Sequence, residues 1–161
     1  MTILEIRKHP DEALLTPVQE LAQADIKGHK IQTLIEDMID TCIDAGGAGL
    51  AANQVGENVS LFVLRWAHKK SQTRTEFVFE AFINPEIIWK KEKQHCKGEG
   101  CLSVPGKYFN VKRYKQLKLK YLDRNGKEAV LTVKRKKLAQ AVLHEMDHLA
   151  GITLAQKGKE A

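Results

Sequence analysis

Two segments of the chain repeat their apolar residues every three or four positions, which is the spacing of a helix with one buried face. The first is residues 25–44, which Gly46 and Gly47 end. Its apolar positions are Ile31, Leu34, Ile35, Met38, Ile39, Cys42 and Ile43. The second lies near the C-terminus, where Gly151 is the expected C-cap. Its apolar stripe consists of Leu138, Val142, Met146 and Leu149.

Between these two helices the pattern is that of strands. β-branched and aromatic residues predict strands at 59–66 and 76–83, and the second is expected to end at Asn84-Pro85. A further strand is expected to begin at 86–89, followed by a solvated charged loop at 90–97.

A hairpin is predicted next. Apolar and charged residues alternate over 108–122, which indicates a strand with one buried face. Asp123-Arg124-Asn125-Gly126 predicts a tight turn, and 129–133 the returning strand. At the two ends of the chain, residues 3–24 are expected to lie extended over the core and residues 152–154 to form a short strand.

Composition narrows the class of protein. The length of 161 residues suits one domain spanning residues 1–161, and a charged fraction of 29% is typical of a globular protein. No apolar run approaches the roughly 20 residues of a membrane span, and residues 1–10 lack the pattern of a secretory signal. Three cysteines are too few for a disulfide scaffold and fit a reducing compartment. We therefore expect a cytoplasmic protein without a membrane partner, with Cys42 a buried side chain on its apolar stripe.

The formal net charge of +6 raises the question of a nucleic-acid partner. The strongest basic run is residues 134–137, and Lys112, Arg113 and Lys115 precede it. Such a run is more typical of a solvated segment than of a binding stripe, so no specific nucleic acid is expected.

His144 and His148 enclose Glu145 in a His-Glu-x-x-His pattern on the second helix. Side chains four residues apart project from nearly the same side of a helix, so both imidazoles can reach one metal ion. Glu145 sits one step round the helix, where a carboxylate can handle a proton at a metal-bound water without being a ligand. The alternative is a chance match with solvated histidines. The apolar stripe argues against it, because buried imidazoles need partners.

Two glycine-rich segments hold further candidates. Residues 47–56 allow close approach of the backbone, and the Gln54 amide can donate to a developing oxyanion there, although a solvated glutamine is the simpler interpretation. Residues 98–106 surround Cys101, which is either a third metal ligand or a buried thiol in a strand. A disulfide between Cys96 and Cys101 is the less favoured alternative.

Three segments together resemble the signature motifs of the peptide deformylases, in the same order and with similar spacing. They are Gly47-x-Gly49-Leu50-Ala51-Ala52-x-Gln54, Glu99-Gly100-Cys101-Leu102-Ser103 and His144-Glu145-x-Asp147-His148-Leu149-x-Gly151. The resemblance runs from about Ile3 to Gly151. Each motif alone is modest, whereas the three in order are highly specific.

The resemblance implies an α+β fold in which antiparallel β-sheets wrap around a central helix carrying the two histidines. It implies a metal ion held by Cys101, His144 and His148, with water as fourth ligand. The ion in this family is usually Fe²⁺, and Zn²⁺, Ni²⁺ or Co²⁺ can occupy the site. The implied reaction removes the N-formyl group from the N-terminal formylmethionine of newly synthesised polypeptides and releases formate.

The implied setting is the cytoplasm, or an organellar stroma or matrix if the chain is a processed form, with transient proximity to the ribosome. Within the site, the resemblance makes Glu145 the group that takes the proton of the attacking water and delivers it to the leaving amine. The Gln54 amide and the N–H of Leu102 would donate to the oxyanion, where losing one donor typically costs about 10²–10³ in rate.

The resemblance also implies surroundings for these groups. Glu99 and Arg113 are expected to pair and to steady the cysteine loop or Asp147. The expected residues of the substrate pocket are Ala48, Gly49, Gly100, Gln140 and Ala141.

The chain departs from the family pattern at several positions. Leu143 stands where a glutamine usually precedes the first histidine, with a modest expected consequence because that side chain points away from the metal. Gln140 lies where an apolar pocket residue is expected, and Ala48 is small for a pocket wall, so the side-chain preference for substrate stays open. Only ten residues follow Gly151, so a C-terminal docking helix is not expected.

Three alternatives compete with this interpretation. A zinc metalloprotease shares the His-Glu-x-x-His pattern but usually takes its third ligand downstream, where Glu160 is the one available residue. A non-catalytic RNA-binding protein would rest on the basic run alone. An inactive relative is disfavoured because all five residues of the implied chemistry are present.

Overall fold

The computed structural model describes residues 2–67 and 77–161, which form one β-sheet together with helices. The α-helices are α1 (Glu12–Leu15), α2 (His29–Asp44), α3 (Lys136–Leu149) and α4 (Leu154–Lys157). Two short 3₁₀ helices are η1 (Gln23–Asp25) and η2 (Ala52–Val55). The strands are β1 (Gly49–Ala51), β2 (Leu61–Ala67), β3 (Phe77–Gly100), β4 (Tyr108–Leu122), β5 (Glu128–Val133) and β6 (Lys159–Glu160).

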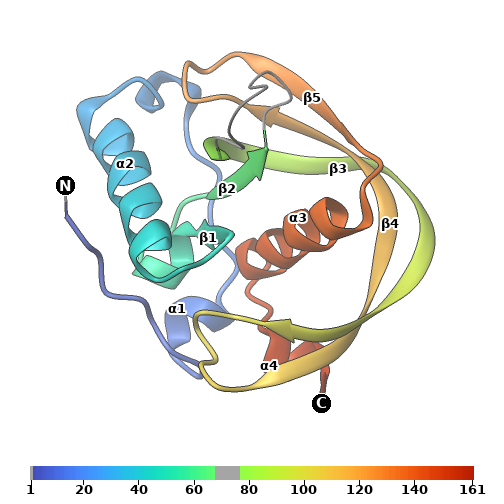
Figure 1. The fold of residues 1–161 in the computed structure, drawn as a ribbon. Helices are drawn as coiled ribbons and strands as arrows, with labels where there is room; N and C mark the ends of the chain where they lie inside the picture. The colour runs from blue at the N-terminus through green and yellow to red at the C-terminus, as the bar shows by residue number, and fades with distance from the viewer. Residues whose placement is uncertain (1, 68–76) are drawn as a thin grey trace.

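The sheet is antiparallel and wraps around α3. Its strand order is β1-β2-β3-β4-β5, and β6 pairs with β4 off this path. The ladder between β3 and β4 shifts register after Ile83, Ile87 and Cys96. Such irregularities bend a strand pair, and the two long strands curve around α3 (Figure 1). The α+β fold with an antiparallel sheet around the central histidine-bearing helix is therefore confirmed.

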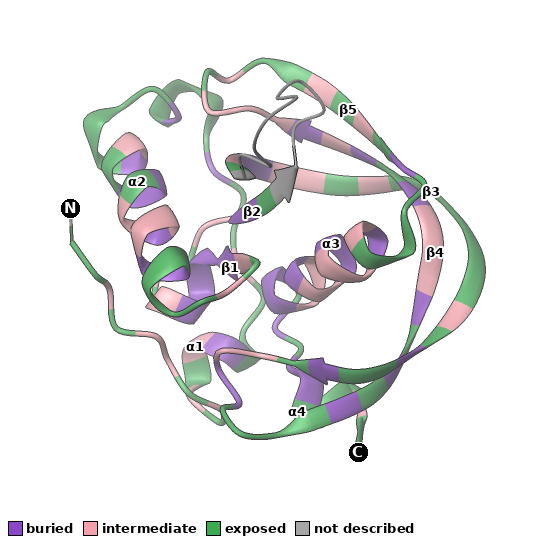
Figure 2. Ribbon diagram, in the orientation of Figure 1, coloured by how far each residue is buried: buried purple, intermediate pink, exposed green. Residues whose placement is uncertain are grey.

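β1 and β2 separate two apolar cores, because successive side chains of a strand point to opposite faces. On one face, Leu50, Leu61 and Val63 pack with α2. On the other, Phe62 and Leu64 pack with α3. Figure 2 shows the buried residues gathered where α2 and α3 face these strands. Burial on both sides therefore holds α3 in a defined place relative to the β1 strand and the loop before it.

The first predicted helix is confirmed as α2, which begins four residues later than the pattern indicated. Its buried residues include Ile31, Leu34, Ile35, Met38 and Cys42. Cys42 is a free, fully buried thiol, and burial raises its pKa to about 12. Ile43, which we placed on the buried stripe, is exposed instead, since it follows Cys42 by about 100° around the helix.

The second predicted helix is confirmed as α3. The predicted stripe packs into the core beneath the sheet and comprises Leu138, Val142, Met146 and Leu149. Gly151 follows the helix with a φ of 72°. A Cβ there would lie 2.8 Å from the backbone nitrogen of Pro17, so glycine is required both for the left-handed conformation and for the close approach of the N-terminal segment.

The predicted hairpin is also confirmed, with β4 and β5 joined by the turn at 123–126. The Asp123 carboxylate accepts hydrogen bonds from the backbone N–H groups of Asn125 (2.8 Å) and Lys127 (2.9 Å). Gly126 adopts a φ of 75°, the conformation that the Asn-Gly sequence favours.

The strand predicted at 86–89 is confirmed, but the strand end predicted at Asn84-Pro85 and the loop predicted at 90–97 are wrong. β3 does not end at Asn84-Pro85, and residues 90–97 are strand rather than loop. Asn84 has a φ of 46°, and the register shifts between Ile83 and Glu86, so the strand passes the proline through an irregularity. The lysines of 90–97 are exposed on the strand, which explains the loop-like composition.

The two ends of the chain differ in part from expectation. Residues 3–24 lie over the core mainly without regular structure, as predicted, apart from α1 and the start of η1. The strand predicted at 152–154 is wrong, because Thr153 precedes α4 and its N–H donates to Gln156 Oε1 (2.9 Å). β1 was not predicted at all, since residues 47–56 have the composition of a connection.

No helix within residues 2–67 and 77–161 is both long and apolar enough to cross a membrane. All three cysteines lie in the described part of the chain and are free, so Cys96 and Cys101 form no disulfide.

Candidate metal and catalytic site

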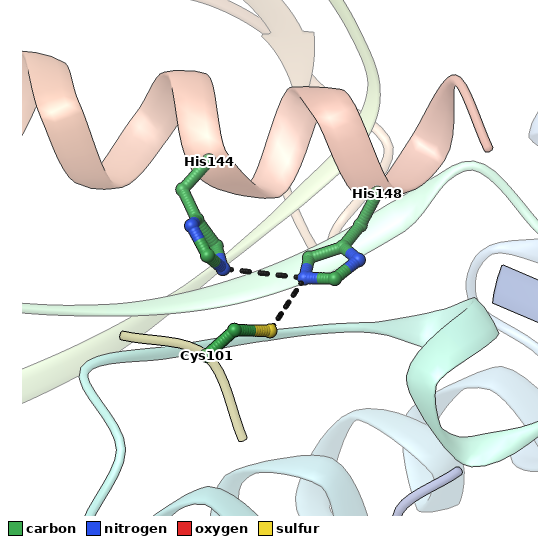
Figure 3. A group of neighbouring side chains, drawn as sticks. All are labelled: Cys101, His144 and His148. Carbon is green, nitrogen blue, oxygen red and sulfur yellow. Dashed lines mark hydrogen bonds between the residues drawn. The ribbon is translucent and has the colours of Figure 1, made fainter. Parts of the chain in front are cut away.

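The structure brings together the side chains of Cys101, His144 and His148 (Figure 3). Cys101 Sγ lies 3.2 Å from His148 Nε2, which in turn lies 3.2 Å from His144 Nε2. The three donor atoms all lie within 4.8 Å of one another. The two histidines come from successive turns of α3, and Cys101 comes from the loop after β3.

This arrangement fits a metal ion. Bonds of about 2.0–2.3 Å from a tetrahedral ion to one thiolate and two imidazoles would place the donors roughly 3.4–3.6 Å apart, close to the separations observed. His148 is only 1% exposed, so its imidazole is removed from water. Three converging donors, one of them deeply buried, are costly for a fold to assemble without a bound ion.

A buried network of charges holds His144 from behind. Its Nδ1 donates to Glu99 Oε1 at 2.7 Å, which leaves Nε2 free to bind a metal. Arg113 is 3% exposed and donates both to Glu99 (2.5 Å) and to Asp147. Burial alone would raise the pKa of the Glu99 carboxyl, but the bonds from His144 and Arg113 outweigh it and lower this pKa to about 2. The predicted Glu99–Arg113 pair is thus confirmed, with Asp147 as its third member.

Gln140 belongs to the same network. Its Nε2 donates to Glu99 Oε2 at 3.0 Å, one helical turn before His144. The Gln140 amide is therefore held in place by the Glu99 carboxylate, in addition to lining the pocket where an apolar side chain was expected. Leu143 is nearly buried in the core beneath the sheet, on the side of α3 away from the metal ligands, as expected.

Glu145 is a buried carboxylate beside the three donors. It is 4% exposed, and in the described part of the chain its Oε2 has no hydrogen-bond partner. Burial raises the pKa of Glu145 to about 7, with a smaller contribution from the charge of Glu99 and opposition from His144. A carboxyl group with a pKa near neutrality can both accept and release a proton at physiological pH.

Gly49 leaves the space that Glu145 occupies. A Cβ at this position would lie 2.5 Å from Glu145 Oε1 and 3.0 Å from its Cδ. The Glu145 carboxylate can therefore take this position only because residue 49 is a glycine.

For the formylated peptide that the resemblance implies as substrate, we expect Gly49→Ala to lower kcat/KM roughly 10- to 10²-fold, because Glu145 must move and small misplacements of reacting groups are costly. Steady-state kinetics with metal content measured on the same samples checks this expectation. Gly98→Ala is the comparison, since a Cβ there meets nothing within 4 Å, although its φ of 65° adds some strain. Equal activity in Gly49→Ala and the parent would contradict the argument.

Gln54 is buried, which corrects the simpler interpretation of a solvated side chain. Its Oε1 accepts from the N–H of Ala51 (2.9 Å), and its Nε2 donates to Ser103 Oγ (3.0 Å) and approaches Cys101 Sγ (3.7 Å). The Gln54 amide is thus oriented with its donor end toward the cysteine loop. Ser103 was not identified from the sequence as a partner of Gln54, and no local pattern indicates that contact.

A cavity of about 760 Å³ opens in front of these groups. It is lined by Gln54, Leu102 and Glu145 and by all five residues expected to bind substrate, Ala48, Gly49, Gly100, Gln140 and Ala141. Lys8, Lys107 and Tyr108 line it as well. Sequence reasoning missed these three, because Lys8 comes from the N-terminal segment and Lys107 and Tyr108 come from the start of β4 and the residue before it, which only folding brings to the cavity.

The alternative third ligand for a protease-like site lies elsewhere. Glu160 is in β6, pairs with Phe109 and forms an ion pair with Lys107 (3.2 Å). Among residues 2–67 and 77–161, the group able to hold a metal contains Cys101 and not Glu160.

Comparison with known proteins assigns the chain to a family. The family model described as polypeptide deformylase matches residues 3–161. A peptide deformylase of Desulfotalea psychrophila is 41% identical over 152 residues, which are 94% of this chain and 85% of that protein. A peptide deformylase of Thermodesulfovibrio yellowstonii is 42% identical over 157 residues, which are 98% of this chain and 90% of that protein.

Solved structures give the same result. The crystal structure of peptide deformylase from Ehrlichia chaffeensis in complex with actinonin matches with a TM-score of 0.85 and 33% identity, covering 99% of this chain and 91% of that chain. A probable peptide deformylase from Synechococcus phage S-SSM7 matches with a TM-score of 0.83 and 29% identity, covering 96% of this chain and 99% of that chain. With its motifs, its fold and its relatives in agreement, the chain belongs to the polypeptide deformylase family.

Proposed function

We propose that Cys101, His144 and His148 hold the metal ion of this deformylase and that Glu145 carries the proton of the reaction. As a member of its family, the protein is a metal-dependent hydrolase that removes the N-formyl group from the N-terminal formylmethionine of newly synthesised polypeptides. The observation that supports the assignment of residues is the convergence of three donor atoms within 4.8 Å beside a buried carboxylate.

The ion we propose is Fe²⁺, with Zn²⁺, Ni²⁺ and Co²⁺ as possible occupants. One thiolate and two imidazoles suit each of these ions, so the ligand set does not choose among them. When bound, such an ion lowers the pKa of a coordinated water toward neutrality and polarises the formyl oxygen.

The chain's own groups supply the remaining steps. Glu145 accepts a proton from the attacking water as its oxygen bonds to the formyl carbon. The Gln54 amide and the N–H of Leu102 donate to the oxygen that becomes negative. Glu145 then returns the proton to the amine nitrogen as the C–N bond breaks, which yields formate and a free N-terminal methionine. The raised pKa of Glu145 suits both transfers.

The buried charges of Glu99, Arg113 and Asp147 behind His144 have a positioning role in this proposal. Glu99 fixes the orientation of His144, and Arg113 compensates the charge of Glu99. The cavity in front of the ligands accepts the formylmethionyl end, with Ala48, Gly49, Gly100, Gln140 and Ala141 in its wall. We place the protein in the cytoplasm, or in an organellar stroma or matrix, and in transient proximity to ribosomes, where its nascent substrates emerge.

The test is formate release from a short formylmethionyl peptide by protein prepared without oxygen and supplied with Fe²⁺ or Ni²⁺. Formate produced in proportion to bound metal supports the proposal. A folded, metal-loaded protein that releases no formate would overturn it.

We expect Cys101→Ser to reduce metal affinity at least tenfold, since loss of even an outer partner of a ligand costs about 10–100-fold. The serine hydroxyl is a much poorer ligand than a thiolate for these ions. Metal content after dialysis, measured by elemental analysis, checks this. Glu160→Ala is the matched comparison and should retain metal and activity, because Glu160 is exposed and paired with Lys107. Metal loss in Glu160→Ala but not in Cys101→Ser would favour the protease-like site.

A further inference from the structure

Positive charge is concentrated in three segments of the chain, 88–98, 110–120 and 134–137. Together they hold half of the chain's 26 lysines and arginines but only one of its 20 aspartates and glutamates, Glu92. The rest of the chain is therefore net acidic, although the whole chain has a charge of +6. This segregation is not what a solubility charge requires, since mixed charges would serve that purpose as well.

The fold joins the first two of these segments into one surface. Residues of the first two pair across the β3–β4 ladder, with His95 opposite Lys112, Lys93 opposite Tyr114 and Lys91 opposite Gln116. The third segment lies on the other side of the ladder, because Gln94, whose Nε2 lies 3.3 Å from the carbonyl oxygen of Lys136, is paired with the buried Arg113. We call the outer surface of the first two segments the basic face; its charged residues are Lys90, Lys91, Lys93, Lys97, Lys112, Lys118 and Lys120.

Most residues of the basic face are exposed, and the outer curve of β3 is coloured mainly as exposed in Figure 2. Among the described residues, the ion pair of this surface joins Lys120 to Glu128 (3.3 Å). Arg113 is not part of this surface, because it is buried against Glu99. Lys112 is thus on the surface, whereas its neighbour Arg113 is buried and Lys115 lies on the same side of β4 as Arg113, paired with Glu92 (3.2 Å).

Aromatic side chains are interspersed among the lysines. Trp89 is 42% exposed and lies opposite Lys118 in the ladder. Lys90 Nζ lies 4.8 Å from the centre of the Tyr114 ring, and Lys93 Nζ lies 5.9 Å from it. Tyr114 is half-buried, whereas the exposed Trp89 ring beside the lysines offers a surface on which a nucleotide base can stack.

From this geometry we propose that the basic face is a docking surface for the phosphate backbone of structured RNA. Same-side residues along a strand are spaced by about 6.8 Å, so 90–97 and 112–120 present two adjacent rows of positive charge over roughly 30 Å. An RNA backbone supplies negative charge at regular intervals over such a length, whereas an acidic peptide rarely does. We expect the contact to be independent of RNA sequence, because the basic face offers charge and a stacking surface rather than side-chain amides placed to hydrogen-bond with base edges. This inference does not depend on the assignment of catalytic residues, because it rests on the outer surface of β3 and β4.

The experiment is fluorescence anisotropy of a labelled RNA hairpin of about 20 base pairs, titrated with the metal-loaded protein at several salt concentrations. We expect a dissociation constant in the micromolar range at 50 mM KCl. Contact with about four phosphates predicts a loss of roughly 10²-fold in affinity between 50 and 200 mM KCl. Absence of measurable binding at 50 mM KCl would overturn the proposal, as would tighter binding to anionic phospholipid vesicles than to the hairpin.

Two triple variants separate the surface from the net charge. Lys91→Glu with Lys93→Glu and Lys112→Glu reverses the centre of the basic face and should weaken RNA binding at least 30-fold. Lys27→Glu with Lys30→Glu and Lys127→Glu changes the net charge equally but uses exposed lysines outside the face, and should weaken it less than fivefold. Equal losses in the two triples would overturn the proposal. Both should retain formate release from a short peptide, so a failure of docking is distinguishable from a failure of catalysis.

Discussion

Replacing Glu145 with glutamine is expected to lower kcat/KM for a formylmethionyl peptide about 10²–10⁴-fold, the range typical for loss of a positioned proton-transfer group. The amide has nearly the shape of the carboxylate but can neither accept the proton of the water nor return it to the amine. Because Glu145 is not among the three converging donors, metal content should not change. The measurement is formate release at saturating metal, together with elemental analysis of the same sample.

A matched control for this variant is Glu86→Gln, which removes a carboxylate from an exposed position on β3 and should leave the rate within twofold of the parent. The buried environment of Glu145 provides a second check. Its Oε2 lacks a hydrogen-bond partner in the described part of the chain, so the neutral amide should not destabilise the fold by leaving a charge unpaired. If Glu145→Gln kept more than a tenth of the parent activity, Glu145 would not be the proton carrier.

Replacing Arg113 with methionine is expected to cost about 3–5 kcal/mol of the free energy of unfolding, the typical loss when one partner of a buried ion pair is removed. Arg113 is 3% exposed and is the cation shared by Glu99 and Asp147. Its loss leaves the charge of Glu99 buried, with the hydrogen bonds from His144 and Gln140 as its remaining polar contacts. Urea denaturation of the metal-free protein measures the effect without the contribution of metal binding.

Lys112→Met tests whether the loss of unfolding free energy in Arg113→Met comes from the buried ion pair or from the removal of any positive charge on β4. Lys112 is the neighbouring residue on β4, points to the opposite face and is exposed, so its replacement should change stability by less than about 0.5 kcal/mol. The double variant Glu99→Gln with Arg113→Met should be less destabilised than the sum of the two single variants, because the pair is then removed together. Additive losses would mean that the two side chains act independently.

Much of the fold could be read from local patterns. Helical spacing predicted α2 and α3, and the Asn-Gly turn predicted the β4–β5 hairpin, because these elements depend on residues close together in the chain. The course of β3 through residues 84–97 could not be read in this way. Its lysines and its proline resemble a loop, and the strand exists because β4 supplies the other half of the ladder.

The site shows the same division. The spacing of His144 and His148 follows from the helix period, so their common direction was predictable from the sequence alone. The sequence suggested Cys101 as a third ligand but left the buried thiol as an alternative. The metal-ligand interpretation is favoured by the position of the loop after β3, because this loop places Cys101 Sγ 3.2 Å from His148 Nε2. Gln54 was a candidate oxyanion donor from the sequence, but only the fold shows that its side chain is buried, with its amide held between Ala51 and Ser103.

By itself the sequence determined the class of fold, the helix that carries the histidines and the resemblance to the deformylases, since each depends on local periodicity or on short motifs. Only the tertiary structure decided which charges are buried and which form a surface. Arg113 and Lys112 are adjacent in the chain, yet strand alternation sends one into the network behind His144 and the other onto the basic face. A residue's burial and partners depend on what packs against each side of its strand, and that is settled by contacts between segments far apart in the sequence.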